Sequence, residues 1–240
     1  MYPKIQSAYR KFHSTETALL KVSNDILRAV DQHQEVVLVL LDLSSAFDTI
    51  DHKILLDRMK SRFGFDGNAL RWFKSYLENR VQSVKIEYFI SKPRRIYYGV
   101  PQGSVLGPLL FSMYIAPIED IIHLHNVKCM IFADDSQMYL AFNSCDRILA
   151  METLRSCIND IIIWNERNKL ICNPGKTEII HFSSRFIDNP PISAFTIGST
   201  DIKLTDQNLG VIFDSNLNFR VHINNICRAS SLAVRNIGCI

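Results

Sequence analysis

The chain has 240 residues and a net charge of +3, and 47% of its residues are hydrophobic and 21% charged. These values are typical of a globular protein of one or two domains, and they exclude a disordered or collagen-like chain. The small net charge indicates no partner, and the longest aliphatic run, the six residues Val36–Leu41, is too short for a membrane helix of ~20 residues.

The first half of the chain predicts helices around one buried strand. Residues 36–43 are aliphatic and β-branched and too few for a typical helix, so we expect a buried strand there. Gly64 is suited to ending a helix, and Asp66 to capping one. The expected elements are a helix from Ser14 or Thr15 to about His33, a strand at 36–43, helices at 52–63 and 66–79, and strands at 81–86 and 95–98.

The second half alternates strands and helices irregularly. Pro108 suits the first turn of a helix, and two apolar strands flank Asp134-Asp135 with the spacing of a hairpin. The expected elements are a helix from Gly107, strands at 127–133 and 137–142, a helix at 146–170, strands at 178–182 and 209–213, and a helix from about Phe219 to Ile240. Because strands and helices do not alternate as regular βαβ units, we expect an α+β fold with an antiparallel sheet backed by helices.

Cysteine and histidine usage indicates no zinc site. The six cysteines include no CxxC pair, and their scatter is typical of buried thiols in a reduced intracellular protein. His123 and His125 are expected in a strand or loop, without a metal-ligand motif beside them. The N-terminal residues carry no hydrophobic signal core, so secretion is not expected.

Charge is unevenly distributed. Residues 36–51 contain three aspartates and no base, whereas residues 52–95 contain eleven bases and four acids. An acidic segment beside a basic one suits a metal-and-phosphate site next to a polyanion. A solvated helix face is the alternative interpretation of the basic segment.

Three carboxylates stand beside apolar strands. Asp42 closes the strand at 36–43, and Asp134 and Asp135 lie between two others. A carboxylate near a sheet core is costly unless it is paired or binds a metal, and ligation by carboxylates alone favours Mg²⁺ or Mn²⁺ over zinc. The alternative for Asp134-Asp135 is a simple tight turn.

Six longer segments, in their order along the chain, resemble the reverse-transcriptase domain of non-LTR retrotransposons. The resemblance is to the chicken-repeat and jockey-like group of LINE-like elements, and it favours the metal site over a simple turn. The combination of PQGxxLGPxLF with FADD is specific, whereas FADD alone is not. The segments that carry the resemblance are YRKFHSTETALL (9–20), LVLLDLSSAFDTIDHKILL (38–56), GVPQGSVLGPLLFSMYI (99–115), IFADDSQMYL (131–140), NPGKTEIIHF (173–182) and NLGVIFDSNLNF (208–219).

The resemblance implies a polymerase palm with partial fingers and a truncated thumb. Asp42, Asp134 and Asp135 would be the catalytic metal ligands, joined by the backbone carbonyl of Leu43. The family places neither Asp48 nor Asp51 on the metal, and we expect Asp51 to cap the helix that begins at His52.

Other residues acquire nucleotide and nucleic-acid roles by the same resemblance. Phe47 would exclude a 2′-hydroxyl, with an ordinary core phenylalanine as the alternative. Gln102 and Gly103 would contact the nucleotide, Gly103 by allowing close backbone approach. Lys176 could protonate the leaving pyrophosphate, or could be an ordinary surface lysine.

A last group would contact nucleic acid. The segment Leu209-Gly210-Val211 resembles the primer-grip hairpin, and Arg10 matches an arginine of the upstream motif. Four basic residues are candidate phosphate contacts by charge alone: Lys53, Arg58, Arg94 and Arg95.

The prediction is therefore an RNA-directed DNA polymerase with Mg²⁺ or Mn²⁺, an RNA template, a DNA primer and dNTPs. It would be intracellular, in the cytoplasm or nucleus, without a membrane and with its oligomeric state undetermined. We expect the palm with partial fingers at residues 1–215 and the start of a truncated thumb at 216–240.

A catalytically impaired remnant that binds nucleic acid is the alternative. Against the family it resembles, we expect this chain to be without the fingers strand before residue 9, a complete thumb and the endonuclease of a full element. A phosphohydrolase built on the same acids is a more distant alternative, since it leaves Phe47 and the primer-grip segment without a role.

Overall fold

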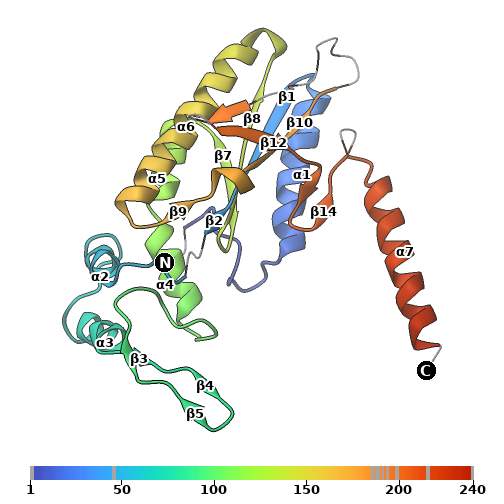
Figure 1. Cartoon of the computed structure of the whole chain (residues 1–240). Helices are drawn as coiled ribbons and strands as arrows, with labels where there is room; N and C mark the ends of the chain where they lie inside the picture. The colour runs from blue at the N-terminus through green and yellow to red at the C-terminus, as the bar shows by residue number, and fades with distance from the viewer. Residues whose placement is uncertain are drawn as a thin grey trace.

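A six-stranded sheet forms the centre of the molecule (Figure 1). Its strand order is β11-β12-β10-β1-β8-β7; β10 and β12 are parallel, and every other neighbouring pair is antiparallel. The computed structural model describes residues 3–44, 47–184, 187, 190, 192, 195–197, 200–214 and 217–238. The six strands are β1 (Glu35–Leu41), β7 (Lys128–Phe132), β8 (Asp135–Phe142), β10 (Glu178–Phe182), β11 (Phe195–Ile197) and β12 (Thr200–Leu204).

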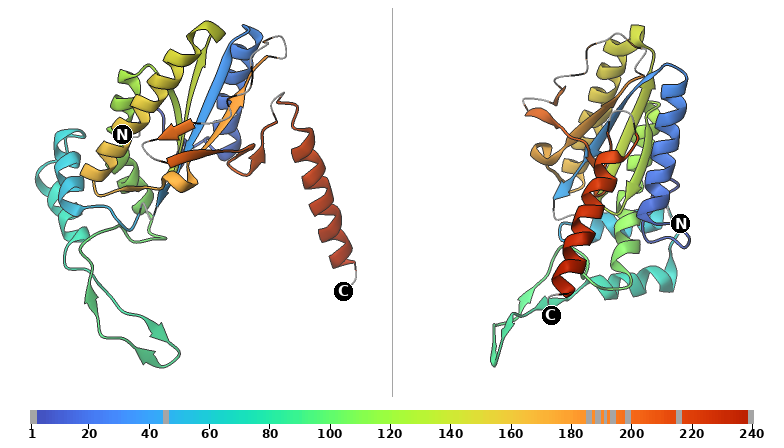
Figure 2. Two further views of the ribbon diagram at one scale, coloured as in Figure 1. Left: turned by 45° about the horizontal axis from the view of Figure 1, so that its top comes forward. Right: turned by 90° about the vertical axis from the view of Figure 1, so that its right-hand side faces the viewer.

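Helices cover both faces of this sheet (Figures 1 and 2). α1 lies on one face, whereas α4, α5 and α6 contribute to the larger core on the other. The helices are α1 (Thr15–Asp31), α2 (His52–Ser61), α3 (Gly67–Leu77), α4 (Gly107–Ile115), α5 (Ile118–Leu124), α6 (Arg147–Arg167) and α7 (Arg220–Ile237). Two short 3₁₀ helices are η1 (Ser144–Asp146) and η2 (Pro174–Lys176).

The central strand β1 explains why its sequence is apolar throughout. Successive side chains of a strand point to opposite faces. Val36 and Leu38 belong to the core under α1, and Val37 and Val39 belong to the core on the other side. Both faces of β1 are therefore covered, so the strand shows no apolar–polar alternation.

Four short ladders lie outside the sheet. Two of them, β3–β6 and β4–β5, form an extended arm that projects from the α2–α3 end of the molecule (Figures 1 and 2). The strands of the four ladders are β2 (Leu43–Ser44) with β9 (Ile171–Cys172), β3 (Val81–Gln82) with β6 (Arg94–Arg95), β4 (Lys85–Ile86) with β5 (Phe89–Ile90), and β13 (Gln207–Asn208) with β14 (Val211–Ile212).

The structure confirms the α+β class and most of the helices expected from sequence. Asp51 caps α2, since its carboxylate accepts hydrogen bonds from the backbone N–H groups of Lys53 and Ile54. Pro108 lies in the first turn of α4, as expected. No helix in the described residues is long and apolar enough to cross a membrane.

Several local expectations are wrong. The segment 81–98 is not two strands of 81–86 and 95–98, because the chain turns back after Ile86 and forms two ladders of two residues each. His123 lies in α5, so it is not in a strand or loop, whereas His125 lies in the turn that follows the helix. The expected strand at 209–213 is reduced to β14, because Leu209 and Gly210 form the turn of a hairpin.

Arg58 has a structural position and is not available for a phosphate. Its guanidinium lies over the rings of Tyr114 and Trp164, 4.9 and 5.2 Å from the two ring centroids. It donates to the carbonyl of Tyr114 and, at 2.6 Å, to Oδ1 of Asn168. Burial lowers the pKa of Arg58 to about 10. The residue therefore ties α2 to α4 and to the end of α6.

Candidate active site

Asp42 lies where the central strand leaves the sheet. β1 ends at Leu41, which is paired with Ser136 of β8, so Asp42 comes beside the start of β8. The next two residues form β2 and pair with β9, and the backbone N–H of Asn173 donates to the carbonyl of Asp42 at 3.1 Å. Asp42 is thus held between two ladders, at the end of the innermost strand.

The β7–β8 hairpin carries the two acids, as the sequence predicts: Asp134 lies in its two-residue turn and Asp135 is the first residue of β8. Phe132 pairs with Asp135, and Ala133 takes a left-handed backbone with φ of 60°. The turn is held from outside by Gln6, which is fully buried. Its Nε2 donates to the Ala133 carbonyl at 3.2 Å, and its Oε1 accepts from the Ala133 N–H at 3.1 Å. The N-terminal segment therefore fixes the turn that carries the two acids.

The charges of Asp42 and Asp134 act on Asp135. Desolvation raises the pKa of Asp135, and the charges of Asp134 and then Asp42 raise it further. The pKa of Tyr9 is also raised, by burial and then by Asp134. Like charges held close together raise a carboxyl pKa, and the pKa of Asp135 is shifted in that direction, with desolvation as the larger cause.

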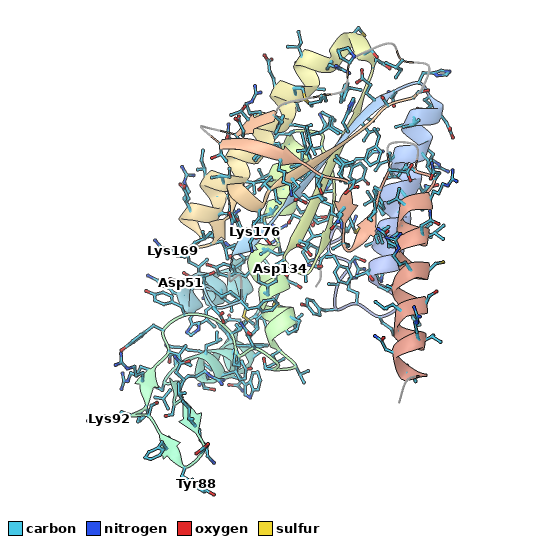
Figure 3. All side chains as sticks on the ribbon, turned by 45° about the vertical axis from the view of Figure 1, so that its right-hand side comes forward. Asp51, Tyr88, Lys92, Asp134, Lys169 and Lys176 are labelled. Carbon is cyan, nitrogen blue, oxygen red and sulfur yellow. The ribbon has the colours of Figure 1, made fainter. Side chains whose placement is uncertain are left out.

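A cavity of about 500 Å³ collects residues from four segments of the chain. Asp42, Asp135, Lys176 and Leu209 all line it, whereas Asp134 is not among its lining residues. Figure 3 shows the labelled Asp134 and Lys176 at the same end of the sheet. The full lining is Leu40, Leu41, Asp42, Asp135, Ser136, Gln137, Gly175, Lys176, Glu178, Lys203, Gln207, Asn208 and Leu209.

Asp42 carries an incompletely satisfied charge. Its Oδ2 is buried and has no hydrogen-bond partner among the described residues. The Nζ of Lys176 lies 3.6 Å away, an ion-pair distance beyond a hydrogen bond. A buried carboxylate oxygen without a donor is costly, and a hard cation satisfies it. The donor set, carboxylates alone, therefore suits Mg²⁺ or Mn²⁺.

The acids are nevertheless not assembled into a ready metal site. In the described part of the chain, no three Asp, Glu, His or Cys side chains are grouped closely enough to hold a metal ion. The backbone brings Asp42 and Asp135 to adjacent positions, and their side chains share one cavity. Ligation by Asp42, Asp134 and Asp135 together stays a prediction.

A second cavity, of about 540 Å³, lies at the loop that contains Gln102. Asp48, Gly99 and Gln102 line it together with the base of the arm. The Nε2 of Gln102 donates to both carboxylate oxygens of Asp48, at 3.0 Å each. Asp48, which the sequence analysis leaves without a role, is thus joined to a predicted nucleotide-binding residue 54 positions away.

Backbone hydrogen bonds hold the same two loops together. The N–H of Gly99 donates to Ile50 at 2.8 Å, and the N–H of Val100 donates to Phe47 at 2.9 Å. The His52 ring nitrogen Nε2 lies 2.7 Å from the carbonyl of Gly99. The segments 47–52 and 99–102 are therefore held together as one unit.

Phe47 is half-buried at the edge of the larger core. Its ring stacks on Phe111 of α4, with centroids 4.7 Å apart and planes at 29°. Neither of the two cavities has Phe47 among the described residues that line it. Gly103 has φ of +76° and open space where a Cβ would lie.

The predicted nucleic-acid contacts lie in two places, the β13–β14 turn and the N-terminal segment. Leu209 and Gly210 form the β13–β14 turn, with φ of 47° and 79°, and Leu209 reaches the first cavity. The hairpin is anchored by Asn208, whose Nδ2 donates to Oε1 of Gln137 at 2.9 Å. Arg10 lines neither cavity and donates to the carbonyl of Gln6 at 3.1 Å. It therefore supports Gln6, the residue that clamps the turn containing Asp134.

Sequence reasoning missed Gln6 and Asp48. Both act through contacts with residues far along the chain, and no local pattern reveals those contacts, although Asp48 lies within the motif at 38–56. The only local indication is that Asp48 falls in the acid-rich segment 36–51.

Comparison with known proteins gives the family. Residues 1–220 match the family described as reverse transcriptase (RNA-dependent DNA polymerase). The chain is 30% identical over 228 residues to the probable RNA-directed DNA polymerase from transposon BS of Drosophila melanogaster, covering 92% of this chain and 25% of that protein. It is 31% identical over 231 residues to the RNA-directed DNA polymerase from mobile element jockey of Drosophila funebris, covering 93% and 24%. The chain thus spans about a quarter of the length of these curated relatives.

Solved structures agree on the fold. Telomerase from Candida albicans, determined with a fragment of telomeric RNA, superposes with a TM-score of 0.55 at 15% identity, covering 87% of this chain and 36% of that one. Apo telomerase from Candida tropicalis gives 0.53 at 17% identity, covering 82% and 41%. These likenesses show a polymerase palm fold. With the family match over 220 residues, the chain belongs to the reverse transcriptase family, as a domain of the non-LTR retrotransposon type.

Proposed function

We propose that the chain is an RNA-directed DNA polymerase domain. The 3′-hydroxyl of a DNA primer attacks the α-phosphate of a dNTP on an RNA template, and pyrophosphate leaves. The observation that carries the proposal is the first cavity, where Asp42, Asp135, Lys176 and the β13–β14 turn meet in a chain of this family. Positioning and charge neutralisation supply most of the rate enhancement in such a transfer.

Asp42, Asp134 and Asp135, with the backbone carbonyl of Leu43, would hold Mg²⁺ or Mn²⁺. The Oδ2 of Asp42, which is buried and accepts no hydrogen bond among the described residues, supports this assignment. When bound, a pair of such ions would neutralise the attacking and leaving oxygens. The chain's own groups hold the reactants in line.

Lys176 would protonate the leaving pyrophosphate as a general acid. Its position 3.6 Å from Asp42 supports a role at the same reacting group. Leu209 and Gly210 would hold the primer end, because their turn borders the cavity. Residues 1–215 would form the palm and part of the fingers, and 216–240 the beginning of the thumb.

Gln102 would contact the nucleotide through its carbonyl oxygen. A carboxylate only accepts hydrogen bonds, so Asp48 must face the Gln102 amide nitrogen, and the amide cannot flip. The Oε1 of Gln102 is thereby directed away from Asp48, free to accept from a sugar hydroxyl. Gly103, with its open left-handed backbone, lets the nucleotide approach the main chain.

Asp48→Asn should therefore weaken dNTP binding more than it slows chemistry. Asparagine can offer its own amide to Gln102, so the fixed orientation is lost. We expect KM for dNTP to rise roughly tenfold, about 1.4 kcal/mol, with kcat reduced less. Steady-state extension kinetics measure this, with Asp57→Asn as a charge-matched control in α2. An unchanged KM would contradict the orientation argument.

The direct test is extension of a labelled DNA primer on an RNA template by the purified chain with Mg²⁺ and dNTPs. Template-dependent products that disappear with a chelator support the proposal. A folded chain that binds the primer–template but never extends it contradicts the proposal and favours the impaired, nucleic-acid-binding alternative.

Phe47→Ala tests the sugar gate. If the ring excludes the 2′-hydroxyl, its removal should raise incorporation of ribonucleotides relative to dNTPs. Phe47→Tyr keeps the ring and should keep the preference. Because Phe47 also stacks on Phe111, truncation costs stability, by up to about 3–5 kcal/mol for a fully packed ring, and folding is checked first. An unchanged preference in folded Phe47→Ala would leave Phe47 as an ordinary core residue.

A further inference from the structure

Gln137 is a buried amide on the strand that carries Asp135. It lies two residues further along β8, so its side chain is on the same face of the sheet as that of Asp135. Its neighbours across the sheet are Leu40 of β1 and Met130 of β7, which pack in the core under α1. Only 1% of Gln137 is exposed, although it lines the 500 Å³ cavity. A polar side chain thus stands among apolar ones directly behind a predicted metal ligand.

The amide of Gln137 is incompletely satisfied. Its Oε1 accepts from Nδ2 of Asn208 at 2.9 Å, but its Nε2 is buried and donates to no acceptor among the described residues. An amide offers one acceptor and two donors, and a buried donor without a partner is costly. An apolar side chain of the same size would avoid this cost. What the amide adds at this position is therefore the hydrogen bond to Asn208.

The β13–β14 hairpin contains little that could hold it in place. Its ladder has two residue pairs, and an isolated two-stranded hairpin is at best marginally stable in water. Leu209 and Val211 pack against the core under α1, on the side of the sheet where α1 and β14 lie (Figure 1). Hydrophobic contacts are not directional, so they keep the hairpin on the sheet without fixing the position of its turn.

One hydrogen bond supplies that direction. Among the described residues, only the Asn208–Gln137 bond joins residues 207–212 to the central sheet. The N–H of Gln207 donates to Oγ1 of Thr205 at 3.2 Å, and the N–H of Ile212 lies 3.4 Å from Nδ1 of His222 in α7. These two contacts join the hairpin to its own flanks. The buried amide pair therefore sets where the turn lies relative to β8.

We propose that Gln137 is a positioning residue for the primer end. Through Asn208 it fixes the turn of Leu209 and Gly210 relative to Asp135, so that the primer hydroxyl lies in line with the reacting phosphate. The inference rests on the proposed function and deepens it, since it adds a residue that acts through another side chain. A misplacement of about 1 Å can cost a hundredfold in rate, so loss of this bond should lower kcat.

The test replaces both amides by apolar side chains of similar size, in Gln137→Met/Asn208→Leu. Because this leaves neither partner of the bond unpaired, urea unfolding should give a free energy close to that of the parent. In primer extension, kcat should fall roughly tenfold to a hundredfold. The affinity for a primer–template duplex, measured by fluorescence anisotropy, should stay unchanged, because Leu209 and Gly210 remain. Hydrogen exchange of the backbone N–H groups should become faster at 207–212 and not in β8 or β10.

Two further variants separate positioning from a general effect on the fold. Gln137→Asn/Asn208→Gln exchanges the two amides and keeps their summed length, so the bond can form again. Its kcat and its exchange at 207–212 should be closer to those of the parent than to those of the apolar pair. Asn165→Leu is the matched control, because Asn165 is a buried amide of α6 whose two polar side-chain atoms have no partner among the described residues. It should leave kcat and the exchange at 207–212 unchanged.

A parent-like kcat in the apolar pair would overturn the proposal, and so would unchanged exchange at 207–212. A loss of kcat that the exchanged amides do not reverse, or that Asn165→Leu shares, would indicate a general effect on the fold and would overturn it too. A parent chain that never extends a primer contradicts the proposed function instead. Hydrogen exchange then decides alone: faster exchange in the apolar pair with recovery in the exchanged pair supports positioning of the turn, and any other pattern overturns it.

Discussion

Asp42→Asn is expected to reduce primer extension by two to three orders of magnitude, about 2.7–4 kcal/mol, the range for removal of one preorganised electrostatic group at a reacting centre. The substitution keeps the size and shape of the side chain and removes its charge. Asp42 stands at the end of the central strand and lines the cavity with Asp135 and Lys176, so the substitution removes a negative charge from the site itself.

The same variant should not be destabilised. Oδ2 of Asp42 is buried without a hydrogen-bond donor, and Asp42 raises the pKa of Asp135 by repulsion. The Lys176 partner is 67% exposed, so the lost ion pair stabilises the chain little. In metal-free buffer, urea unfolding of Asp42→Asn should give a free energy equal to or above that of the parent.

Single-turnover extension and urea unfolding, measured together, check this prediction. Glu166→Gln, an exposed acid in α6, is the control for a lost negative charge and should affect neither. Parent-like extension by Asp42→Asn would contradict the catalytic assignment. A large loss of stability would instead show that Asp42 serves the fold.

The parts of the fold that follow a local pattern could be predicted from sequence. The aliphatic run of β1 and the paired strands around Asp134 specify their elements, because both faces of β1 are covered and the turn length is short. The arm did not follow the prediction, because a hairpin without a core takes its register from the turn after Ile86 and not from apolar alternation. α5 has seven residues, too few for a clear helical period, which is why His123 was misplaced.

The candidate site shows the same division. Asp42, Asp134 and Asp135 could be named because motifs surround them. The clamp by Gln6 and the support of Gln102 by Asp48 could not, because each is a side-chain contact between residues 127 and 54 positions apart, respectively. A motif specifies residue types at short spacing, whereas these contacts exist only once the sheet has formed.

Among small substitutions in the two joined loops, at residues 47–52 and 99–102, Gly99→Ala should be the most damaging. Gly99 has φ of +83°, where an L-residue is strained by about 1–3 kcal/mol. A Cβ at this position would lie 2.8 Å from the carbonyl oxygen of Asp48 and 2.9 Å from its Cα. Both are backbone atoms, so no side-chain rotation can relieve the contact.

The damage should reach the site through the backbone. Gly99 is hydrogen-bonded to the carbonyl of Ile50 and to the ring of His52. The clash with Asp48 would push the two loops apart. We therefore expect loss of the Asp48–Gln102 hydrogen bond together with a loss of stability. Extension should fall through a higher KM for dNTP as well as through the smaller folded fraction.

Gly64→Ala is the matched control for this prediction. Gly64 has φ of +70° but open space around the position of a Cβ, so alanine there introduces the backbone strain without the clash. Urea unfolding should show a larger loss of free energy for Gly99→Ala than for Gly64→Ala, with the difference measuring the contact with Asp48. If the two variants lose the same free energy and Gly99→Ala keeps its KM, the segments 47–52 and 99–102 are not held together as the one unit that the hydrogen bonds indicate.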